Sequence, residues 1–451
     1  MLCVAQFVVV LDVTVVATAL PAIGTDLGFA PAGPAWVITA YTVVMAGLLV
    51  LGGRVADLAG PRPMFAVGLA VFALASVACA LAWSPAVLIA ARAVQGAGAA
   101  LLSPAALAAL HALVTEPEAR RRALGWWTAA AAGGGACGWM LGGVLVELAG
   151  WRWIFAVNAP VGAAALLAAR YALARVGGRA PRRPLDLPGA LLVTAGIALA
   201  TLGLSRVAEQ PVRADGWVTA AAAAVLLALF VRRKRRTGDA LVPPRLVRAP
   251  GVLGGNLTAA ALTAATTPAM LTVVLYVQDT LRLPPARGSL LFPAFNLAVV
   301  AGSLLGARLL ARRGARALLA YGFAAVVAGI ALLGTLPGQG VAVGTLLGSF
   351  ALMGGGLGTA SVASTAAGTA EVDERDRGVA AGLLTSTAQL GTALGLAVTT
   401  PVVAAAAPMT GYRLGFATAA IIGVAGLLAA RTVPRSPRLR SPRLRQDGVT
   451  S

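Results

Sequence analysis

Long apolar runs divide this 451-residue sequence from its first residue to about residue 431. A transmembrane helix needs about 20 consecutive, mainly apolar residues, and about fourteen segments come near or exceed that length. The composition agrees, because 59% of the residues are hydrophobic, only 12% are charged, and the mean hydropathy is +0.84. The segments are 1–22, 34–53, 64–83, 86–113, 123–146, 153–174, 187–205, 216–231, 251–277, 288–307, 317–335, 340–364, 378–405 and 411–431. The sequence therefore predicts an all-α, polytopic membrane protein with about fourteen transmembrane helices.

Arginine is concentrated in alternate connections between these segments. By the positive-inside rule, the arginine-rich connections are cytoplasmic, and both termini lie on that side. They are 54–62, 120–122, 170–183, 232–236, 308–316, 375–377 and 431–445, whereas 24–33, 83–85 and 338–340 carry no basic residue. The net charge of +20 is spread over these short segments, so no basic domain is available to bind nucleic acid. Lys234 is the only lysine, and the excess of Ala, Gly, Arg and Pro is typical of a GC-rich bacterial genome, which places the protein in a bacterial inner membrane.

The sequence start is unusual for such a protein. The first span opens directly at Met1 without a basic leader, which favours a truncated or misassigned start. A signal peptide is the alternative for residues 1–22. The length of the run and the lack of a small-residue cleavage site before the next span speak against it.

One carboxylate, Asp12, lies inside the first apolar run, Phe7 to Ile23 (FVVVLDVTVVATALPAI). About a dozen residues into the run corresponds to roughly 18 Å along a hydrocarbon core of about 30 Å. Ionisable groups at such depth are rare, face a bundle interior or a water-filled cavity, and are typical of proton relays. Asp12 is therefore the predicted proton site, and a position near a helix end is the alternative.

Arg92 lies inside the fourth apolar run. An uncompensated guanidinium costs about 3 kcal/mol at a helix centre on insertion scales, so Arg92 needs an acceptor. The candidates are Asp12, backbone carbonyls and the substrate. Because Arg92 follows Pro85 by only several residues, snorkelling to the outer surface is the alternative.

A weak internal repeat relates the two ends of the chain. One set of matches, Gly52/Gly306, Arg54/Arg308, Gly60/Gly314 and Arg62/Arg316, shares the offset 314 − 60 = 254, and a second, Arg120/Arg377, Gly125/Gly382, Gly134/Gly391 and Gly138/Gly395, has the offset 395 − 138 = 257. Two parallel halves related by an axis along the membrane normal produce such a repeat. The predicted parts are a six-helix half at 1–174, two inserted helices with basic linkers at 175–250, a second six-helix half at 251–434, and a basic cytoplasmic tail at 435–451.

Short motifs then indicate a family. The stretch 11–21 (LDVTVVATALP) resembles the first-helix signature of the fourteen-span drug:proton antiporter group of the major facilitator superfamily, and 92–98 (RAVQGAG) resembles its R-x-x-Q-G-x-G motif. The stretch 53–62 (GRVADLAGPR) resembles the superfamily loop G-x-L-A-D-R-x-G-R-K but has Leu58 and Pro61 where basic residues are usual. The stretch 134–143 (GGACGWMLGG) resembles the antiporter motif G-x-x-x-G-P-x-x-G-G with Trp139 at the proline position. The segment 151–160 (WRWIFAVNAP) and the stretch 377–395 are more specific to the fourteen-span group.

The resemblance covers nearly the whole chain and implies proton-coupled export of amphipathic small molecules, as in drug and antibiotic efflux, by alternating access. It implies proton coupling at Asp12 and Arg92, a gating loop with Gly53, Asp57, Gly60 and Arg62, and an antiporter-motif helix with Gly134, Gly138, Gly142 and Gly143. Glycines at four-residue spacing also let another helix pack closely. The expected partners are the substrate, protons and membrane lipids, with no cofactor and with the chain as a monomer.

Amides within or beside the apolar runs are candidates for the substrate cavity, although bonding between helices is at least as good an interpretation for each. They are Gln95, Asn158, Asn256, Gln278, Asn296 and Gln389. Tryptophans at the span ends, including Trp151 and Trp153, are expected to be interface anchors.

Other functional classes lack parts. An ATP-driven pump needs a G-x-x-x-x-G-K-[ST] loop, and Lys234 is followed by Arg235. A membrane enzyme is not supported either, because the chain has one histidine, no paired intramembrane carboxylates, and cysteines (Cys3, Cys79, Cys137) at unrelated spacings that fit neither a disulfide framework nor a metal site. Export of an endogenous metabolite or lipid-like molecule, and a non-transporting membrane sensor on the same scaffold, stay open as alternatives.

Overall fold

The computed structural model describes residues 1–30, 33–114, 116–173, 187–209, 213–236, 249–284, 287–288, 290–337, 343–370, 372 and 377–434, and all regular secondary structure in them is helical. The first set of helices is α1 (Leu2–Leu27), α2 (Trp36–Ala59), α3 (Pro61–Ala80), α4 (Pro85–Leu113), α5 (Pro117–Ala149), α6 (Arg152–Ala156) and α7 (Asn158–Ala172). Next come α8 (Leu187–Glu209) and α9 (Ala214–Arg236). The last set is α11 (Pro250–Leu275), α13 (Phe292–Arg313), α14 (Ala315–Leu333), α15 (Val343–Ala370), α16 (Arg377–Ala404) and α17 (Pro408–Ala429). Short elements are η1 (Gly33–Ala35), the π-helical turn η2 (Tyr276–Thr280) and η4 (Ala430–Thr432).

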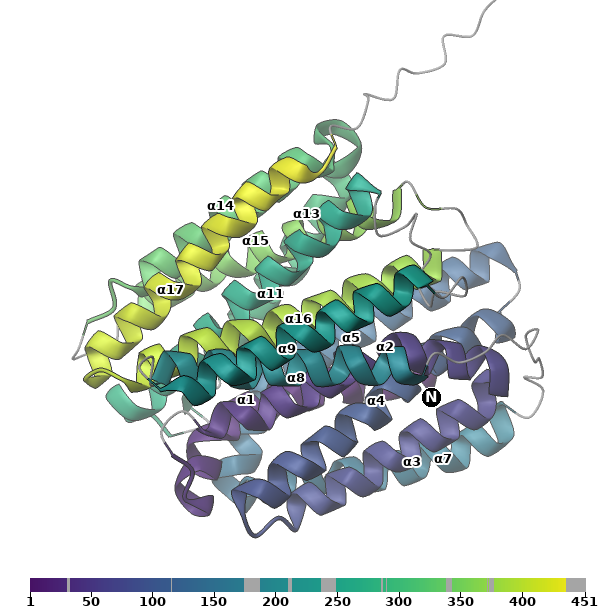
Figure 1. Ribbon diagram of the computed structural model, residues 1–451, viewed down its shortest axis with the longest axis horizontal. Helices are drawn as coiled ribbons and strands as arrows, with labels where there is room; N and C mark the ends of the chain where they lie inside the picture. Colours follow the sequence, from purple (N-terminus) through teal and green to yellow (C-terminus); the bar gives the residue numbers. More distant parts are fainter. Residues whose placement is uncertain are drawn as a thin grey trace, which may run out of the picture.

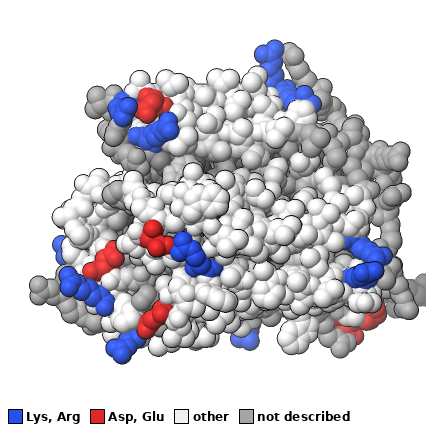
Figure 2. All heavy atoms as spheres, turned by 90° about the horizontal axis from the view of Figure 1, so that it is seen from below, with Lys and Arg blue, Asp and Glu red and all other residues white. Residues whose placement is uncertain are grey.

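The helices have the length and polarity of membrane spans. Within the described residues, 11 stretches of helix are long and apolar enough to cross a bilayer. Helices α2, α5 and α8 carry shorter apolar stretches, Gly33–Leu49, Gly133–Ala149 and Leu191–Ala200. Figure 2 shows most charged side chains of one face gathered toward the two ends of the bundle, with a mainly uncharged band between them. The all-α membrane fold is thus confirmed, and the count of fourteen spans stays a prediction.

The two sets of helices pack in equivalent ways (Figure 1). In the first set, α1 packs on α5, α2 on α4, and α3 on α4 and α7. In the second, α11 packs on α16, α13 on α15, and α14 on α15 and α17. The sets meet where α2 contacts α16, α5 contacts α13 and α1 contacts α11. Two parallel repeats related by an axis along the bundle would give this pattern.

Glycines matched by the repeat occupy equivalent places. Gly60, between α2 and α3, has φ 94°, and Gly314, between α13 and α14, has φ 75°, both in the region that favours glycine. A Cβ built at Gly138 of α5 would lie 2.9 Å from the carbonyl oxygen of Leu11 in α1. One built at Gly395 of α16 would lie 2.6 Å from Cα of Ala264 in α11. Both glycines therefore bring the backbones of the corresponding helix pairs into close contact.

Helices α8 and α9 form a pair that joins the two sets. α8 packs on α9 and also contacts α2 and α16. Ile197 of α8 is buried with Val43 of α2 and Ala393 of α16. α9 exposes Trp217, Val218 and Val225, as a lipid-facing helix does. The proposed boundaries at 174/175 and 434/435 fall at residues 174–186 and 435–451, outside the described residues, so the division into parts stays a prediction.

We expect Gly138→Ala to destabilise the protein, because the added methyl group meets the backbone of α1 and overpacking costs about 1–3 kcal/mol. Gly133→Ala is the matched control, since its Cβ would lie 3.7 Å from the ring of Phe7, which is ordinary van der Waals contact. Thermal unfolding of the purified protein in detergent should show a lower midpoint for Gly138→Ala and no decrease for Gly133→Ala. Equal midpoints would contradict the assignment of Gly138 to the α1–α5 contact.

Candidate functional site

Asp12 is completely buried in the first set of helices, where it is the centre of a polar network. Its Oδ2 accepts a hydrogen bond from Nη1 of Arg92 in α4, and the two groups form an ion pair. Its Oδ1 accepts from Nε2 of Gln95, 2.9 Å away, and from Nδ2 of Asn158 in α7, 3.0 Å away. Three donors from two other helices therefore hold the carboxylate, and Asp12, one of the three candidate acceptors for Arg92, is in contact with it.

Arg92 is equally buried, with 0% of its side chain exposed, so it does not snorkel to the surface. Its Nε donates to the carbonyl oxygen of Val37 in α2 at 2.8 Å, and Nη1 also donates to Oε1 of Gln95 at 2.6 Å. Arg92 and Gln95 are three residues apart on α4, which places them on one face of the helix. The predicted R-x-x-Q spacing thus supplies both the cation and an amide to the carboxylate.

Aromatic rings enclose the guanidinium. Its Cζ lies 4.4 Å from the ring centroid of Tyr41 in α2 and 5.7 Å from that of Phe155 in α6. A cation over an aromatic face gains about 0.5–2 kcal/mol, and more as water is excluded. The rings also keep water away from the ion pair, because Tyr41 and Phe155 are both completely buried.

Helix α3 completes the network with Ser76 and Cys79, also three residues apart. Ser76 Oγ accepts from Nε2 of Gln95 at 2.8 Å and from Nδ2 of Asn158 at 3.4 Å, and it donates to the carbonyl of Phe72 at 2.8 Å. The Cys79 thiol donates to Oε1 of Gln95 at 3.7 Å. These contacts fix which amide atom faces Asp12 and orient both amides.

The other predicted polar residues lie elsewhere. Asn256 in α11 accepts from Oγ1 of Thr387 in α16 at 2.7 Å, which is a bond between helices. Nε2 of Gln278 donates to the carbonyl oxygen of Thr18 in α1 at 3.1 Å. Nδ2 of Asn296 donates to the carbonyl oxygen of Phe292 at 3.3 Å, and Nε2 of Gln389 donates to Sδ of Met45 at 4.0 Å. Gln95 and Asn158 belong to the Asp12 network, and a contact with substrate stays a prediction for all six.

The antiporter-motif helix packs on α1 along the glycines named above. A Cβ at Gly134 would lie 3.2 Å from the backbone nitrogen of Leu11, and one at Gly142 would lie 2.9 Å from the carbonyl of Val15. Gly143 is buried. α5 continues through this stretch as one helix of 33 residues.

The residues of the predicted gating loop lie at the junction of α2 and α3. Gly53 is near the end of α2, Gly60 links the helices, and Arg62 is exposed in the first turn of α3. The side chain of Asp57 lies outside the described residues. A gating role for this loop stays a prediction.

Trp139, at the proline position of the motif, joins the two sets of helices. It is 7% exposed, and its ring stacks on that of Phe292 in α13 at a centroid distance of 4.6 Å and an interplanar angle of 14°. Phe292 in turn stacks on Phe350 of α15 at 5.6 Å. Trp139 thus makes an aromatic contact between α5 and α13.

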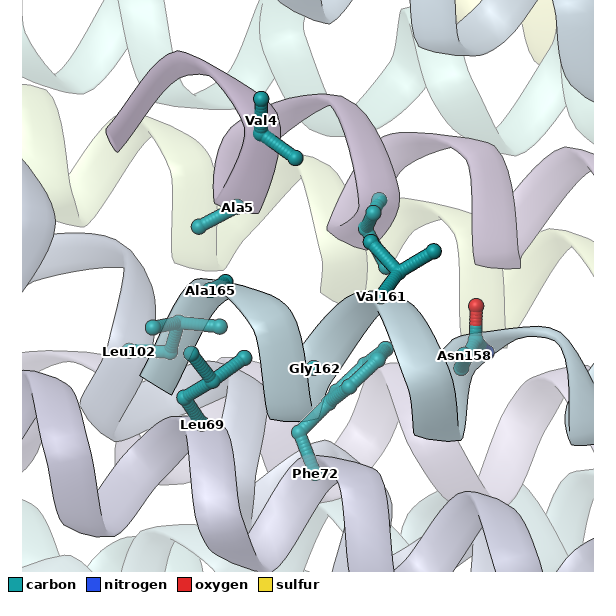
Figure 3. A pocket seen from close by; sticks show the side chains of 10 residues that line it. Val4, Ala5, Leu69, Phe72, Leu102, Asn158, Val161, Gly162 and Ala165 are labelled. Atoms are coloured by element: carbon teal, nitrogen blue, oxygen red, sulfur yellow. The ribbon is translucent and has the colours of Figure 1, made fainter. Parts of the chain in front are cut away.

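A small cavity lies beside the network (Figure 3). Asn158 stands at one end of it, and the other lining side chains are apolar, from α1, α3, α4 and α7. They are Val4, Ala5, Val8, Leu69, Phe72, Leu102, Val161, Gly162 and Ala165. Apart from Asn158, the walls of this cavity offer no polar side chain to bind a water molecule.

A second cluster of charged side chains lies at the C-terminal end of α1. Asp26 accepts from Nη1 of Arg152 at 2.7 Å and from Nε1 of Trp151 at 3.0 Å, and Arg152 lies 4.4 Å over the Trp151 ring. Trp151 is only 4% exposed, so its expected role as an interface anchor is wrong, whereas Trp153 is 57% exposed. Being half-exposed, the ion pair contributes little to stability.

Comparison with known proteins identifies the family. The family model described as Major Facilitator Superfamily matches residues 2–396 and 253–450. The chain belongs to the major facilitator superfamily. It is 40% identical over 409 residues to the cephamycin export protein CmcT of Amycolatopsis lactamdurans, covering 88% of this chain and 82% of the relative. It is 32% identical over 452 residues to the lincomycin resistance protein of Streptomyces lincolnensis, covering 99% and 93%.

Solved transporter structures share the fold. The peptide transporter POT, solved in complex with sulfate, superposes with a TM-score of 0.70 over 96% of this chain and 92% of that one, at 17% sequence identity. At this identity the likeness concerns the fold alone. Within the described residues, no group of three or more His, Cys, Asp and Glu side chains is placed to hold a metal ion.

Sequence reasoning missed several members of the network. The sequence assigned no site role to Tyr41, Ser76, Cys79 and Phe155. Ser76 is nevertheless the single hydroxyl in an apolar stretch of α3, and Tyr41 is the single phenol in an apolar stretch of α2. A lone polar side chain in a span is a usable signal, since it needs a partner in the bundle. Which partner it meets depends on helix packing, which the sequence does not state.

We expect the Asp12–Arg92 pair to be strongly coupled in stability. Removing one partner of a buried pair costs about 3–5 kcal/mol because a charge is left without compensation, whereas replacing both can be nearly neutral. Unfolding midpoints of Asp12→Asn, Arg92→Gln and the double variant should therefore be far from additive, with the double variant more stable than the sum predicts. Additive losses would show that the two groups do not act as a pair.

Proposed function

We propose that this superfamily member is a proton-coupled antiporter that exports amphipathic small molecules, including antibiotics, across the cell membrane. The observation that carries the proposal is the ion pair of Asp12 and Arg92, completely buried at the contact of α1 and α4. The names of similar proteins, a cephamycin export protein and proteins of lincomycin and puromycin resistance, support the substrate class. The proposal includes fourteen spans, two six-helix halves with α8 and α9 inserted, and cytoplasmic termini.

The energetics of the pair supply a coupling mechanism. Protonation of Asp12 removes the anion that compensates Arg92, and breaking a buried pair costs about 3–5 kcal/mol. Shifting a two-state equilibrium from 1:99 to 99:1 takes about 5.5 kcal/mol. One protonation therefore supplies a large part of the energy needed to change which side of the protein is open.

In the proposed cycle, Asp12 takes up a proton from the outside, which favours the return to the inward-open state. It releases the proton toward the cytoplasm as the substrate binds. A membrane potential adds about 2.3 kcal/mol per elementary charge per 100 mV to an electrogenic step. The protein acts as a monomer in this scheme, because each chain carries a complete pair of charges.

The runner-up is export of a compound that the host itself makes, and the name of the cephamycin export protein favours it. A membrane sensor on the same scaffold is the non-transporting alternative. The deciding experiment is export of puromycin, lincomycin, a cephamycin and a monocationic dye from cells that produce the protein, with and without an uncoupler. Uncoupler-sensitive export of any one of them supports the antiporter, and retention of all four contradicts it.

We expect Asp12→Asn to abolish export driven by a pH gradient while the protein stays inserted, because the amide cannot bind and release a proton at this position. Purified protein in proteoliposomes with an imposed pH gradient gives the measurement, normalised to the folded protein in each preparation. Asp26→Asn is the control, since Asp26 is a half-exposed carboxylate at the end of the same helix. Uphill export by Asp12→Asn at the wild-type rate would refute the role of Asp12.

We also expect dications to be poor substrates. Asp12 is the one carboxylate in the network and is already opposed by Arg92, so a second positive charge would be desolvated without compensation. A neutral or monocationic amphipathic molecule gains from apolar walls and a few amides. Competition between a monovalent dye and its bivalent analogue tests this expectation, and equal or better export of the bivalent dye would overturn it.

A further inference from the structure

Among the residues that the structure describes, two buried donors beside the ion pair have no hydrogen-bond partner. They are Nη2 of Arg92 and the hydroxyl of Tyr41, and both side chains are 0% exposed. A buried polar group without a partner costs about 1–3 kcal/mol, so such groups in a native protein call for an explanation.

The two groups belong to one contact. The guanidinium of Arg92 lies over the Tyr41 ring at 4.4 Å, and its other two nitrogens are used by Asp12, Gln95 and Val37. The free edge of the guanidinium and the hydroxyl of the ring beneath it are therefore both unused in this state. A phenol oxygen accepts as well as donates, whereas a guanidinium only donates.

When Asp12 is protonated, Arg92 requires another hydrogen-bond acceptor, and the Tyr41 hydroxyl can supply one. The neutral carboxyl no longer compensates Arg92, whose buried charge then requires another acceptor. Neighbouring acceptors are already occupied, since Oε1 of Gln95 accepts from Arg92 and Cys79, and the Val37 carbonyl accepts from Nε.

We propose that Tyr41 is a positioning residue of the proton-coupling step, and that its hydroxyl oxygen accepts a hydrogen bond from Nη2 of Arg92 when Asp12 is protonated. A small shift of the guanidinium along the ring that already holds it makes this exchange. The inference rests on the proposed role of Asp12. While Asp12 is ionised, the Tyr41 hydroxyl has no partner. When Asp12 is protonated, the same hydroxyl becomes an acceptor for Arg92.

The test is infrared difference spectroscopy of the purified full-length protein on acidification, which reports the carboxylic C=O stretch of protonated Asp12 without a substrate. The band is assigned by its loss in Asp12→Asn. The titratable and charged groups that face the pair are Tyr41 from α2 and Cys79 from α3, while α7 supplies the neutral Asn158. Tyr41→Phe should reduce the band several-fold at a fixed acidic pH, because the protonated state loses its acceptor.

The unfolding midpoint separates the proposed role from a purely structural one. Under the proposal, Tyr41→Phe removes an unpartnered hydroxyl and keeps the ring, so the midpoint should be unchanged or higher. A purely structural role of the hydroxyl predicts a lower midpoint. Tyr276→Phe is the matched control, since the Tyr276 hydroxyl donates to the carbonyl of Pro337 at 2.8 Å, away from the network, and its loss should leave the band unchanged. Export driven by a pH gradient should fall several-fold in Tyr41→Phe and stay at the wild-type rate in Tyr276→Phe.

The outcomes separate the two proposals. If the wild type shows no such band, the proton role of Asp12 fails, and the inference about Tyr41 fails with it. If the band is present and Tyr41→Phe leaves both it and export unchanged, the inference about Tyr41 fails alone. A reduced band with an unchanged midpoint supports both.

Discussion

A buried charge must be compensated where no water reaches it, and this constraint organises the first set of helices. Asp12 and Arg92 are both inaccessible to solvent, so each depends on the other and on amides from two helices. The carboxylate uses donors from α4 and α7, and the guanidinium uses a carbonyl of α2. Four helices are therefore held around one pair of charges, and a change in the charge of Asp12 alters the contacts of all four.

The two sets of helices share their packing, but among the described residues only the first carries the Asp12–Arg92 pair. Matched glycines bring α5 onto α1 and α16 onto α11, so both sets have the same close helix contacts. In α11, the polar counterparts are hydroxyls and amides that bond between helices, such as Asn256 with Thr387. The scaffold is thus shared, while the completely buried ion pair lies in one set among the described residues.

Apolar run length and motif spacing predicted much of this structure, because both follow from periodic geometry. The helix type, the pairing of Asp12 with Arg92 and the equivalent turns at Gly60 and Gly314 were accessible in this way. Burial was harder to predict, as Trp151 shows: it flanks a span, yet it is buried on Asp26. The contact of Tyr41 with Arg92 depends on how α2 packs against α4. Such packing depends on residues throughout the chain and cannot be predicted from one short motif.

Contacts between the two sets of helices contribute to the energy that protonation of Asp12 must supply in the proposed cycle. Trp139 stacks on Phe292, and an aromatic pair contributes about 0.5–1.5 kcal/mol beyond the area it buries. Gln278 donates to Thr18, and a hydrogen bond between membrane helices averages about 0.6 kcal/mol. Each of these terms is smaller than the roughly 3–5 kcal/mol that removing one partner of a buried ion pair costs. Thr18 is on the same helix as Asp12, so in the proposed cycle a displacement of α1 on protonation acts directly on a contact weak enough to yield to it.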